Sequence, residues 1–194
     1  PVASALERAW ASHAMAAEVA ALGIGGDDGA FATERIVLSG EQVRAAGDDD
    51  LRGSGAWSEW KLFDGATWDE GRCARLATIC ATLRAAPEVS GTVAGVAQQG
   101  EVTLYKLLPG ARILPHSGVT NRALVLHFPL RGTAGVRVRV GDEWRGYEEG
   151  RAMIFDDSFE HEVRHGGALT RYVLFAVLHH PGLGVPTLGL KDEV

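Results

Sequence analysis

The fold is decided by a run of nine residues, Thr170-Arg171-Tyr172-Val173-Leu174-Phe175-Ala176-Val177-Leu178, which is apolar over most of its length. Short apolar runs bounded by turn residues are typical of β-strands. Four shorter runs of this kind precede it, at residues 102–108, 123–130, 136–140 and 152–155. Gly, Pro, Asn and Asp separate the runs at turn-length spacing. The sequence after Pro87 therefore predicts an antiparallel β-structure built from short strands.

Two helices are predicted ahead of the strand region. Residues 4–22 and residues 67–86 both carry apolar side chains at helical spacing. Each segment also has a Ser or Thr three residues before a Glu, the spacing of a capping box: Ser4 with Glu7, and Thr67 with Glu70. A short strand is predicted at residues 36–38, between two loops rich in Gly and Asp. We expect the second helix to pack on the outside of a sheet.

The order of these elements indicates the fold class. A helical block followed by a strand block favours helices on one face of an antiparallel β-sandwich or jelly roll, so the fold is mainly β with flanking helices. A chain of 194 residues with 46% hydrophobic residues is long enough for one sizeable core. We predict a single domain over residues 1–194, in which residues 1–56 form a helical and loop portion and residues 57–183 form the core.

Composition excludes some classes of partner. The formal net charge of −6 is spread without long blocks of like charge, whereas binding to phosphates requires a basic surface. A nucleic-acid polymer is therefore not an expected partner. The apolar runs are shorter than the roughly 20 residues that cross a membrane, and no basic segment followed by an apolar one opens the chain. The sequence predicts a cytoplasmic protein without a membrane partner.

The two cysteines, Cys73 and Cys80, fall on the second predicted helix. On a continuous helix, seven residues place them about 10 Å apart along the axis, at 1.5 Å per residue. That separation excludes a disulfide, and two free thiols fit a reducing compartment.

His116 and His161 differ from most of the seven histidines in the chain. Each lies at a predicted strand edge beside turn residues, where a side chain can face a pocket. Imidazole is a common ligand for borderline metals such as Fe(II), so two histidines on separate strands suggest a metal site. His13, His165 and His179 are expected to be solvated or packing residues.

Arg171 breaks the apolar pattern of its strand. It alternates with Val173, Phe175 and Val177, so the two-residue period of a strand places its guanidinium on the same face as three apolar side chains. A charge in that position needs a partner, and the planar fork of Arg matches a carboxylate. This carboxylate belongs either to an Asp or Glu of the protein or to a ligand.

Several ordered blocks of the sequence resemble one family. They are Leu108-Pro109-Gly110, His116-Ser117-Gly118-Val119-Thr120-Asn121, Glu149-Gly150, Phe155-Asp156-Asp157-Ser158-Phe159-Glu160-His161-Glu162-Val163, Arg171 and His180-Pro181. Over about residues 57–183 the chain is similar to the aspartyl/asparaginyl beta-hydroxylase family of 2-oxoglutarate-dependent oxygenases. The resemblance implies a cupin-like double-stranded β-helix that uses Fe(II), 2-oxoglutarate and O2.

The resemblance also implies roles for single residues. His116 and His161 would hold the iron and Arg171 would bind the distal carboxylate of 2-oxoglutarate, which makes these three the catalytic residues. His127 matches a family histidine that helps to hold that carboxylate; the alternative is a buried histidine satisfied by the backbone. Tyr105 stands where relatives often carry a small hydroxyl residue, so its phenol would take over that hydrogen bond or belong to the core.

One departure from other iron oxygenases concerns the third metal ligand. Their facial triad has a carboxylate two residues after the first histidine, and here that residue is Gly118. The resembling family binds iron through two histidines, with water completing the shell. Asp156 or Asp157 is the alternative third ligand, although the Asp-Asp-Ser turn is better placed to orient the loop through hydrogen bonds around the metal.

A second departure concerns substrate recognition. After Asn121 the family usually has two arginines separated by a leucine, which meet acidic groups of the substrate or co-substrate. This chain has Arg122-Ala123-Leu124-Val125-Leu126 instead. Arg122 is shifted by one position, which would turn it to the other face of a strand. The substrate is therefore expected to differ from an aspartyl side chain.

The resemblance implies an oxygenase that hydroxylates an unactivated C–H bond of an amino-acid-like, peptidyl or other small-molecule substrate and releases succinate and CO2. One alternative is a halogenase that uses the open position at Gly118. Another is a non-catalytic cupin-like binding module. Arg171 on an inward face favours an enzyme, because a metal-binding barrel alone has no need for a buried carboxylate clamp.

Overall fold

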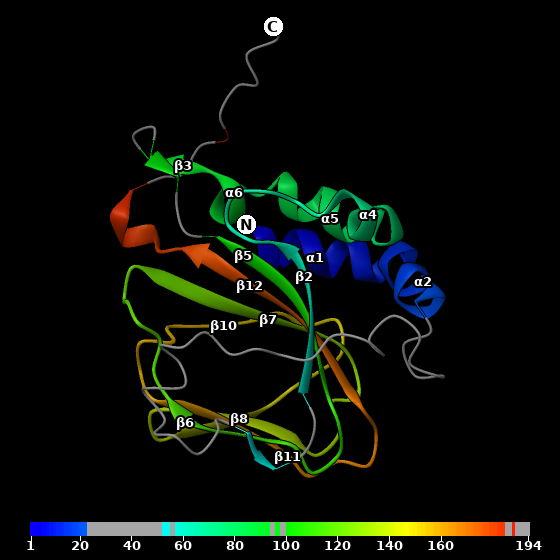
Figure 1. The fold of residues 1–194 in the computed structure, drawn as a ribbon, viewed down its shortest axis with the longest axis vertical. Coiled ribbons are helices and arrows are strands. Elements are labelled where there is room, and N and C mark those ends of the chain that lie inside the picture. Colours follow the sequence, from blue (N-terminus) through cyan, green and yellow to red (C-terminus); the bar gives the residue numbers. More distant parts are fainter. Residues whose placement is uncertain (23–51, 55–56, 94–95, 98–99, 185–187, 189–194) are drawn as a thin grey trace, which may run out of the picture.

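The computed structural model describes residues 1–22, 52–54, 57–93, 96–97, 100–184 and 188, and the strand predicted at residues 36–38 lies outside this part of the chain. Within it, two five-stranded antiparallel sheets face each other, with helices stacked on one of them (Figure 1). From β5 onward the chain passes back and forth between the two sheets. The predicted double-stranded β-helix is confirmed.

The sheet that carries the helices, here called the major sheet, has the strand order β10-β7-β12-β5-β2. Its strands are β2 (Trp57–Phe63), β5 (Glu101–Leu107), β7 (Ala123–Arg131), β10 (Met153–Phe155) and β12 (Arg171–His179). The minor sheet has the order β1-β6-β11-β8-β9. Its strands are β1 (Arg52–Ser54), β6 (Arg112–His116), β8 (Val136–Val140), β9 (Glu143–Gly146) and β11 (His161–His165). A separate hairpin pairs β3 (Thr92–Val93) with β4 (Val96–Ala97), and η1 (Pro181–Leu183) follows β12.

The helices cover the outer face of the major sheet (Figure 1). They are α1 (Val2–Ala11), α2 (Ala14–Ala21), α4 (Glu70–Arg75), α5 (Ala77–Arg84) and α6 (Pro87–Ser90). Their buried side chains, such as Leu6 and Leu83, share one core with Leu104, Phe128 and Leu174 of the sheet. The expectation that the second helix packs on the outside of a sheet is confirmed. Among the described helices, none has the length and hydropathy needed to cross a membrane.

Neither predicted capping box forms, and the first predicted helix is interrupted. His13 adopts a left-handed conformation with φ 64°, which separates α1 from α2. The Thr67 hydroxyl donates to the Asp64 carboxylate, and Asp69 caps α4 instead by accepting from the backbone N–H of Arg72 at 2.9 Å. The carboxylate of Glu7 accepts from the backbone N–H of Ala152 at 3.1 Å, so it serves a contact between distant segments.

The prediction that Cys73 and Cys80 cannot form a disulfide is wrong. It assumed a continuous helix, but Leu76 has φ −130° and ψ 49° and separates α4 from α5. The break brings the two Cα atoms within 5.6 Å, and a disulfide joins the cysteines. The Glu18 carboxylate accepts from the backbone N–H of Thr78 at 2.6 Å and so supplies the cap that α5 lacks in its own sequence. The sequence argument for a reducing compartment therefore no longer holds.

Trp10 anchors the N-terminal helices to the far edge of the major sheet. Its ring packs edge-on against Phe128, with centroids 6.0 Å apart, and lies directly over Gly150. Gly150 has φ 73°, and a Cβ atom there would overlap the indole.

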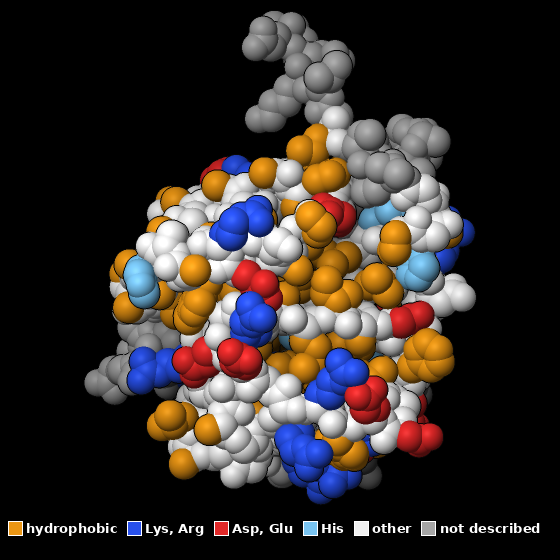
Figure 2. Space-filling model, turned by 180° about the vertical axis from the view of Figure 1, so that it is seen from behind, with side chains coloured by type: hydrophobic (Ala, Val, Ile, Leu, Met, Phe, Trp, Pro, Cys, Tyr) orange, Lys and Arg blue, Asp and Glu red, His pale blue; other side chains and the backbone are white. Residues whose placement is uncertain are grey.

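Figure 2 shows the molecule from the side opposite to that of Figure 1. Hydrophobic side chains gather near the middle of this surface, and charges of both signs surround them.

We expect Gly150→Ala to lower the free energy of unfolding by about 2–4 kcal/mol. Left-handed backbone costs a non-glycine residue about 1–2 kcal/mol, and overlap with Trp10 adds a packing cost of similar size. Gly141→Ala is a matched control, because Gly141 has φ 56° but no heavy atom lies within 4 Å of its added Cβ. Urea unfolding of both variants measures the difference. If both variants lose the same free energy of unfolding, the position of the Trp10 indole does not depend on Gly150.

Candidate functional site

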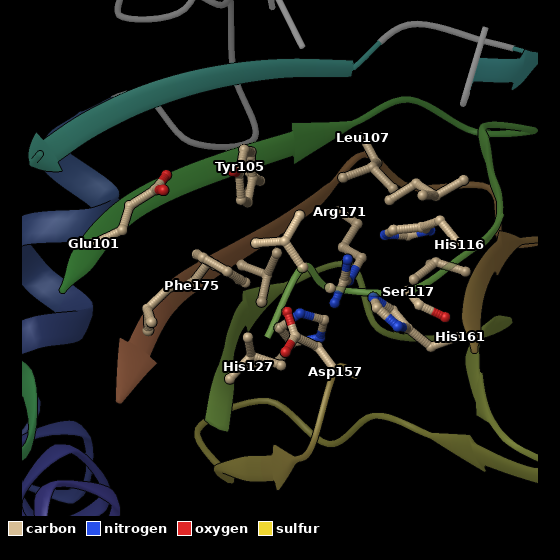
Figure 3. Close-up of a pocket in the computed structure, with 17 residues that line it drawn as sticks. Glu101, Tyr105, Leu107, His116, Ser117, His127, Asp157, His161, Arg171 and Phe175 are labelled. Atoms are coloured by element: carbon tan, nitrogen blue, oxygen red, sulfur yellow. The ribbon is translucent and has the colours of Figure 1, made fainter. Parts of the chain in front are cut away.

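A cavity of about 240 Å³ lies between the two sheets. All five candidate residues of the sequence analysis line it: Tyr105, His116, His127, His161 and Arg171. Figure 3 shows His116 and His161 close together toward one end of the cavity and Glu101 at the opposite end. The five residues come from β5, β6, β7, β11 and β12, so the cavity depends on both sheets.

His116 and His161 are direct register partners on the adjacent strands β6 and β11. Their ring centroids are 4.1 Å apart. The Nδ1 atom of His116 lies 2.8 Å from the backbone oxygen of Leu114, and Nδ1 of His161 lies 3.0 Å from that of Phe159. Since a carbonyl oxygen only accepts, each Nδ1 donates its proton, and in the neutral ring Nε2 carries the lone pair.

The protonation state of the pair suits metal binding. Burial lowers the pKa of His116, and the neighbouring His161 lowers it further. Burial also lowers the pKa of His161. Desolvation disfavours the charged imidazolium, so both rings are held in the neutral form that a metal requires. The pair therefore presents two neutral rings whose centroids lie 4.1 Å apart in the cavity wall.

Arg171 is 1% exposed, and its Nε and Nη2 atoms have no hydrogen-bond partner among the described residues. Burial lowers the pKa of its guanidinium. The group lies over the ring of Tyr147, 4.2 Å from the centroid. The predicted alternation is confirmed, because Val173, Phe175 and Val177 line the same cavity. The guanidinium is thus a buried cation with two unpaired N–H donors on one edge. This arrangement matches the two oxygens of a carboxylate, which would complete its hydrogen bonds.

His127 and Tyr147 stand beside Arg171. The Nδ1 atom of His127 is hydrogen-bonded to the Tyr147 hydroxyl at 2.8 Å. Burial, followed by the charge of Arg171, holds the pKa of His127 well below its usual value, so the ring is neutral. Sequence reasoning missed Tyr147, which directly follows β9 and has no apolar alternation and no family block to mark it.

Tyr105 lies on β5 opposite Val173 of β12. Its ring packs edge-on against Phe175, with centroids 5.5 Å apart. Burial, followed by the negative charge of Glu101, raises the pKa of its phenol well above the ordinary value. Tyr105 is thus a neutral part of the cavity wall, between the Arg171 end and the Glu101 end.

The space beside Gly118 is filled by Asp157. A Cβ atom on Gly118 would lie 2.5 Å from Oδ2 of Asp157 and 2.6 Å from its Cγ. The backbone N–H of Gly118 also donates to the backbone oxygen of Asp157 at 2.6 Å. Burial raises the pKa of Asp157, with a further contribution from Asp156. The Asp157 carboxylate therefore stands where a carboxylate at position 118 would begin.

Asp156 turns to the backbone, where its Oδ1 accepts from the N–H of Ser158 at 2.9 Å. Within the part of the chain that the structure describes, no group of three or more His, Cys, Asp or Glu side chains is arranged to hold a metal. The two histidines are therefore a pair, with Asp157 beside them in the cavity wall.

The other candidates lie outside the cavity. Arg122 is exposed and lies in the bend that precedes β7. His165 accepts a hydrogen bond from the backbone N–H of Gly167 at 3.2 Å, and Nε2 of His179 lies 3.2 Å from the backbone oxygen of Gly184. His180 caps η1 by accepting from the backbone N–H of Gly182. These histidines have local structural contacts.

An ion-pair network holds the strand of His161 from the outside. Glu162 is 4% exposed, and its carboxylate accepts from Nε of Arg139 at 2.7 Å and Nε of Arg164 at 2.9 Å. Arg139 also donates to Glu160 at 2.7 Å, so it binds the residues on both sides of His161. Several bonds on one planar guanidinium fix the backbone more firmly than a single pair would.

Comparison with known proteins gives consistent matches. A family model described as aspartyl/asparaginyl beta-hydroxylase matches residues 32–181. The aspartyl/asparaginyl beta-hydroxylase of Homo sapiens is 33% identical over 137 residues, which make up 70% of this chain and 17% of that protein. The Mus musculus protein of the same name is 34% identical over 137 residues, 70% of this chain and 18% of that protein. The chain thus spans under a fifth of these relatives' length.

Solved structures with a similar arrangement are more distant in sequence. The cupin domain of an XRE family transcriptional regulator from Enterobacter cloacae is 16% identical, with a TM-score of 0.41, and the match covers 64% of this chain and 97% of that chain. A predicted oxalate decarboxylase from Thermotoga maritima is 13% identical, with a TM-score of 0.35, over 48% of this chain and 95% of that chain.

Proposed function

Since this chain belongs to the aspartyl/asparaginyl beta-hydroxylase family, we propose that it is an Fe(II)- and 2-oxoglutarate-dependent dioxygenase. It would hydroxylate an unactivated C–H bond of an amino-acid-like, peptidyl or other small-molecule substrate and release succinate and CO2. The observation that carries the proposal is the meeting of two features in one cavity. A pair of neutral histidines with free Nε2 atoms lies there together with a buried arginine fork that lacks an anion.

His116 and His161 would hold the iron. Their free Nε2 atoms are the donors that Fe(II) takes from imidazole, and the backbone oxygens of Leu114 and Phe159 fix the ring orientation. Asp157 would act beside the metal, because its carboxylate reaches the space next to Gly118. From there it can accept hydrogen bonds from water and orient it.

Arg171 would bind the distal carboxylate of 2-oxoglutarate. Its Nε and Nη2 donors form the fork that a carboxylate accepts in a bidentate manner, and burial makes this pairing strong. The Tyr147 hydroxyl lies against His127, and the Tyr147 ring lies under the guanidinium. These two neighbours would orient the carboxylate from the side and keep Arg171 from turning away.

Iron with 2-oxoglutarate and O2 supplies the oxidant for the C–H bond when all three are bound. The protein would position the substrate and exclude water from the site. Val173, Phe175 and Val177 form an apolar floor beside Arg171, which keeps water from the reacting carbon. Two of the residues that line the cavity, His127 and Tyr105, remain uncharged at neutral pH.

The proposal is tested by offering panels of amino acids, peptides, nucleosides and acyl metabolites to the protein with Fe(II), 2-oxoglutarate and air. Substrate-dependent release of succinate, together with a product heavier by one oxygen, is the expected result. If no panel raises succinate above the iron and 2-oxoglutarate background, while the protein also fails to bind either cofactor, the chain is a cupin-like binding module.

We expect hydroxylation and no halogen transfer. A halide beside the metal would need the space next to Gly118, and that space holds the Asp157 carboxylate, whose negative charge repels an anion. With a turned-over substrate in ¹⁸O2, the product should therefore carry one ¹⁸O atom whether or not chloride is present. Product masses measured with and without chloride decide the point. A chlorinated product that dominates in chloride would identify a halogenase.

A further inference from the structure

The part of the cavity that remains for a substrate is the Glu101 end. If Arg171 and the two histidines serve the co-substrate and metal, as the proposed function has it, the substrate must lie over the rest of the major sheet. Figure 3 shows Glu101 at the end of the cavity opposite the histidines, with Tyr105 and Phe175 between them. The residues at that end therefore define the substrate.

Strand register orders these residues into rows across β5, β12 and β7. Leu107 pairs with Arg171, and Tyr105 pairs with Val173. The third row contains Thr103, Phe175 and His127, and the fourth contains Glu101, Val177 and Val125. At about 3.3 Å per residue, three two-residue steps separate the Arg171 row from the Glu101 row by about 20 Å. The fourth row is thus well beyond the Arg171 row.

The fourth row is apolar except for one acid. Val125 is 2% exposed and lies beside Val177, and both line the cavity with Phe175 of the next row. Val119, from the loop after β6, faces the same cavity. A substrate over these residues gains by burying hydrocarbon, at about 25 cal/mol per Å² of apolar surface.

The charged groups at this end are unfavourable for an anion. Of the described residues that line the cavity, Arg171 carries the one positive charge, and Glu101 and Asp157 carry negative charges. Arg171 lies three rows away from Glu101 and is assigned to the co-substrate. A substrate carboxylate above Val177 would therefore lose hydration and meet the negative charge of Glu101, whose partner Lys61 is not among the residues that line the cavity.

Among the described residues, both polar contacts of the Glu101 carboxylate use Oε1. The Thr103 hydroxyl donates to it at 2.7 Å, and the Lys61 ammonium lies 3.5 Å away. Lys61 is 40% exposed in its side chain and belongs to the edge strand β2. Thr103 fixes the carboxylate within the fourth row, where it can meet a cation that enters with the substrate.

We infer that the substrate of this site is an alkyl ammonium. Its aliphatic chain contains the carbon that reacts, and the charged group nearest to that carbon is the ammonium, which Glu101 binds. The apolar surface of Val125, Val177 and Phe175 receives the chain, and Glu101 sets the end at which the ammonium lies. A substrate with a carboxylate in that position is rejected.

Ligands that differ only in their charged end test this inference. Hexylamine, hexanol and hexanoate are titrated into the protein loaded with 2-oxoglutarate and a redox-inert divalent metal, and again into the metal-free protein, with NMR detection. We expect hexylamine to bind at least about tenfold more tightly than hexanoate, with hexanol between them. In Glu101→Gln, hexylamine should fall to the affinity of hexanol. In Val125→Arg, hexanoate should become the preferred ligand.

Lys61→Met is the matched control, because it removes the cation that competes for Glu101 and should leave the preference for hexylamine intact or larger. Wild-type preference for hexanoate, or a preference for hexylamine that Glu101→Gln leaves unchanged, would overturn the inference. The metal-free arm separates this outcome from the proposed function. Preference for the amine in a protein that binds neither iron nor 2-oxoglutarate would refute the oxygenase and retain the cationic ligand.

Discussion

Replacing Arg171 by alanine is expected to raise the 2-oxoglutarate concentration needed for half-maximal turnover by at least about a hundredfold. Loss of one partner from a buried charge pair commonly costs roughly 3–5 kcal/mol, and each 1.4 kcal/mol is a factor of ten. The free protein should behave differently. Because Nε and Nη2 of Arg171 have no described protein partner and the guanidinium contact that is lost is the one with Tyr147, the alanine variant should unfold at nearly the same temperature as the wild type.

The two measurements together separate a ligand clamp from a structural ion pair. Turnover is followed as succinate release against 2-oxoglutarate concentration, and stability is followed by thermal unfolding without ligand. Arg171→Lys serves as the control for charge, since lysine keeps the cation but lacks the planar fork, and it should restore only part of the affinity. Lower stability with unchanged 2-oxoglutarate dependence would return Arg171 to a structural role.

His116→Ala and His161→Ala are each expected to abolish turnover and to remove tight binding of iron, without unfolding the protein. Each of the two rings presents an Nε2 atom to the proposed metal, and one imidazole alone would bind it more weakly than two. Anaerobic titration with Fe(II) measures the affinity of each variant, and circular dichroism measures the fold. His180→Ala is the control, because His180 caps η1 outside the cavity and its variant should keep full iron binding.

Retention of iron affinity and activity in either variant would remove that histidine from the metal site. The remaining histidine and Asp157 would then be the groups to test, since Asp157 also lines the cavity and lies beside Gly118.

Much of the major sheet could be predicted because its strands follow a simple rule. In β12, residues 171, 173, 175 and 177 face the cavity, while Tyr172, Leu174 and Ala176 pack under the helices. Alternation with a period of two fixes both faces from the sequence alone. The buried position of Arg171 followed from the same rule, since a guanidinium among valines has to face inward with them.

The strands of the minor sheet were harder to predict from the sequence because they are short and partly polar. β6 is Arg-Ile-Leu-Pro-His and has no buried residue, and β11 is His-Glu-Val-Arg-His. In β11 the polar residues on the two faces of the strand have different roles. His161 faces the cavity, and Glu162 joins an ion-pair network outside it. Neither strand has the apolar run by which sequence reasoning finds strands.

Errors in the helical region came from tertiary contacts that override local signals. The break at Leu76 follows no Gly or Pro, and its cap comes from Glu18, which lies 60 residues from Thr78 in the sequence. No local pattern reveals such a cap, so the disulfide between Cys73 and Cys80 could not be predicted. Asp157 is similar, because its place beside Gly118 depends on the approach of two loops.

We propose that one cavity binds Fe(II) and 2-oxoglutarate through His116, His161 and Arg171. An anaerobic calorimetric titration of 2-oxoglutarate into the wild-type protein, with and without one equivalent of Fe(II), tests this binding. We expect one 2-oxoglutarate per chain, bound much more tightly when iron is present and lost in Arg171→Ala. Absence of any iron-dependent binding of 2-oxoglutarate would show that the cavity does not hold the two together.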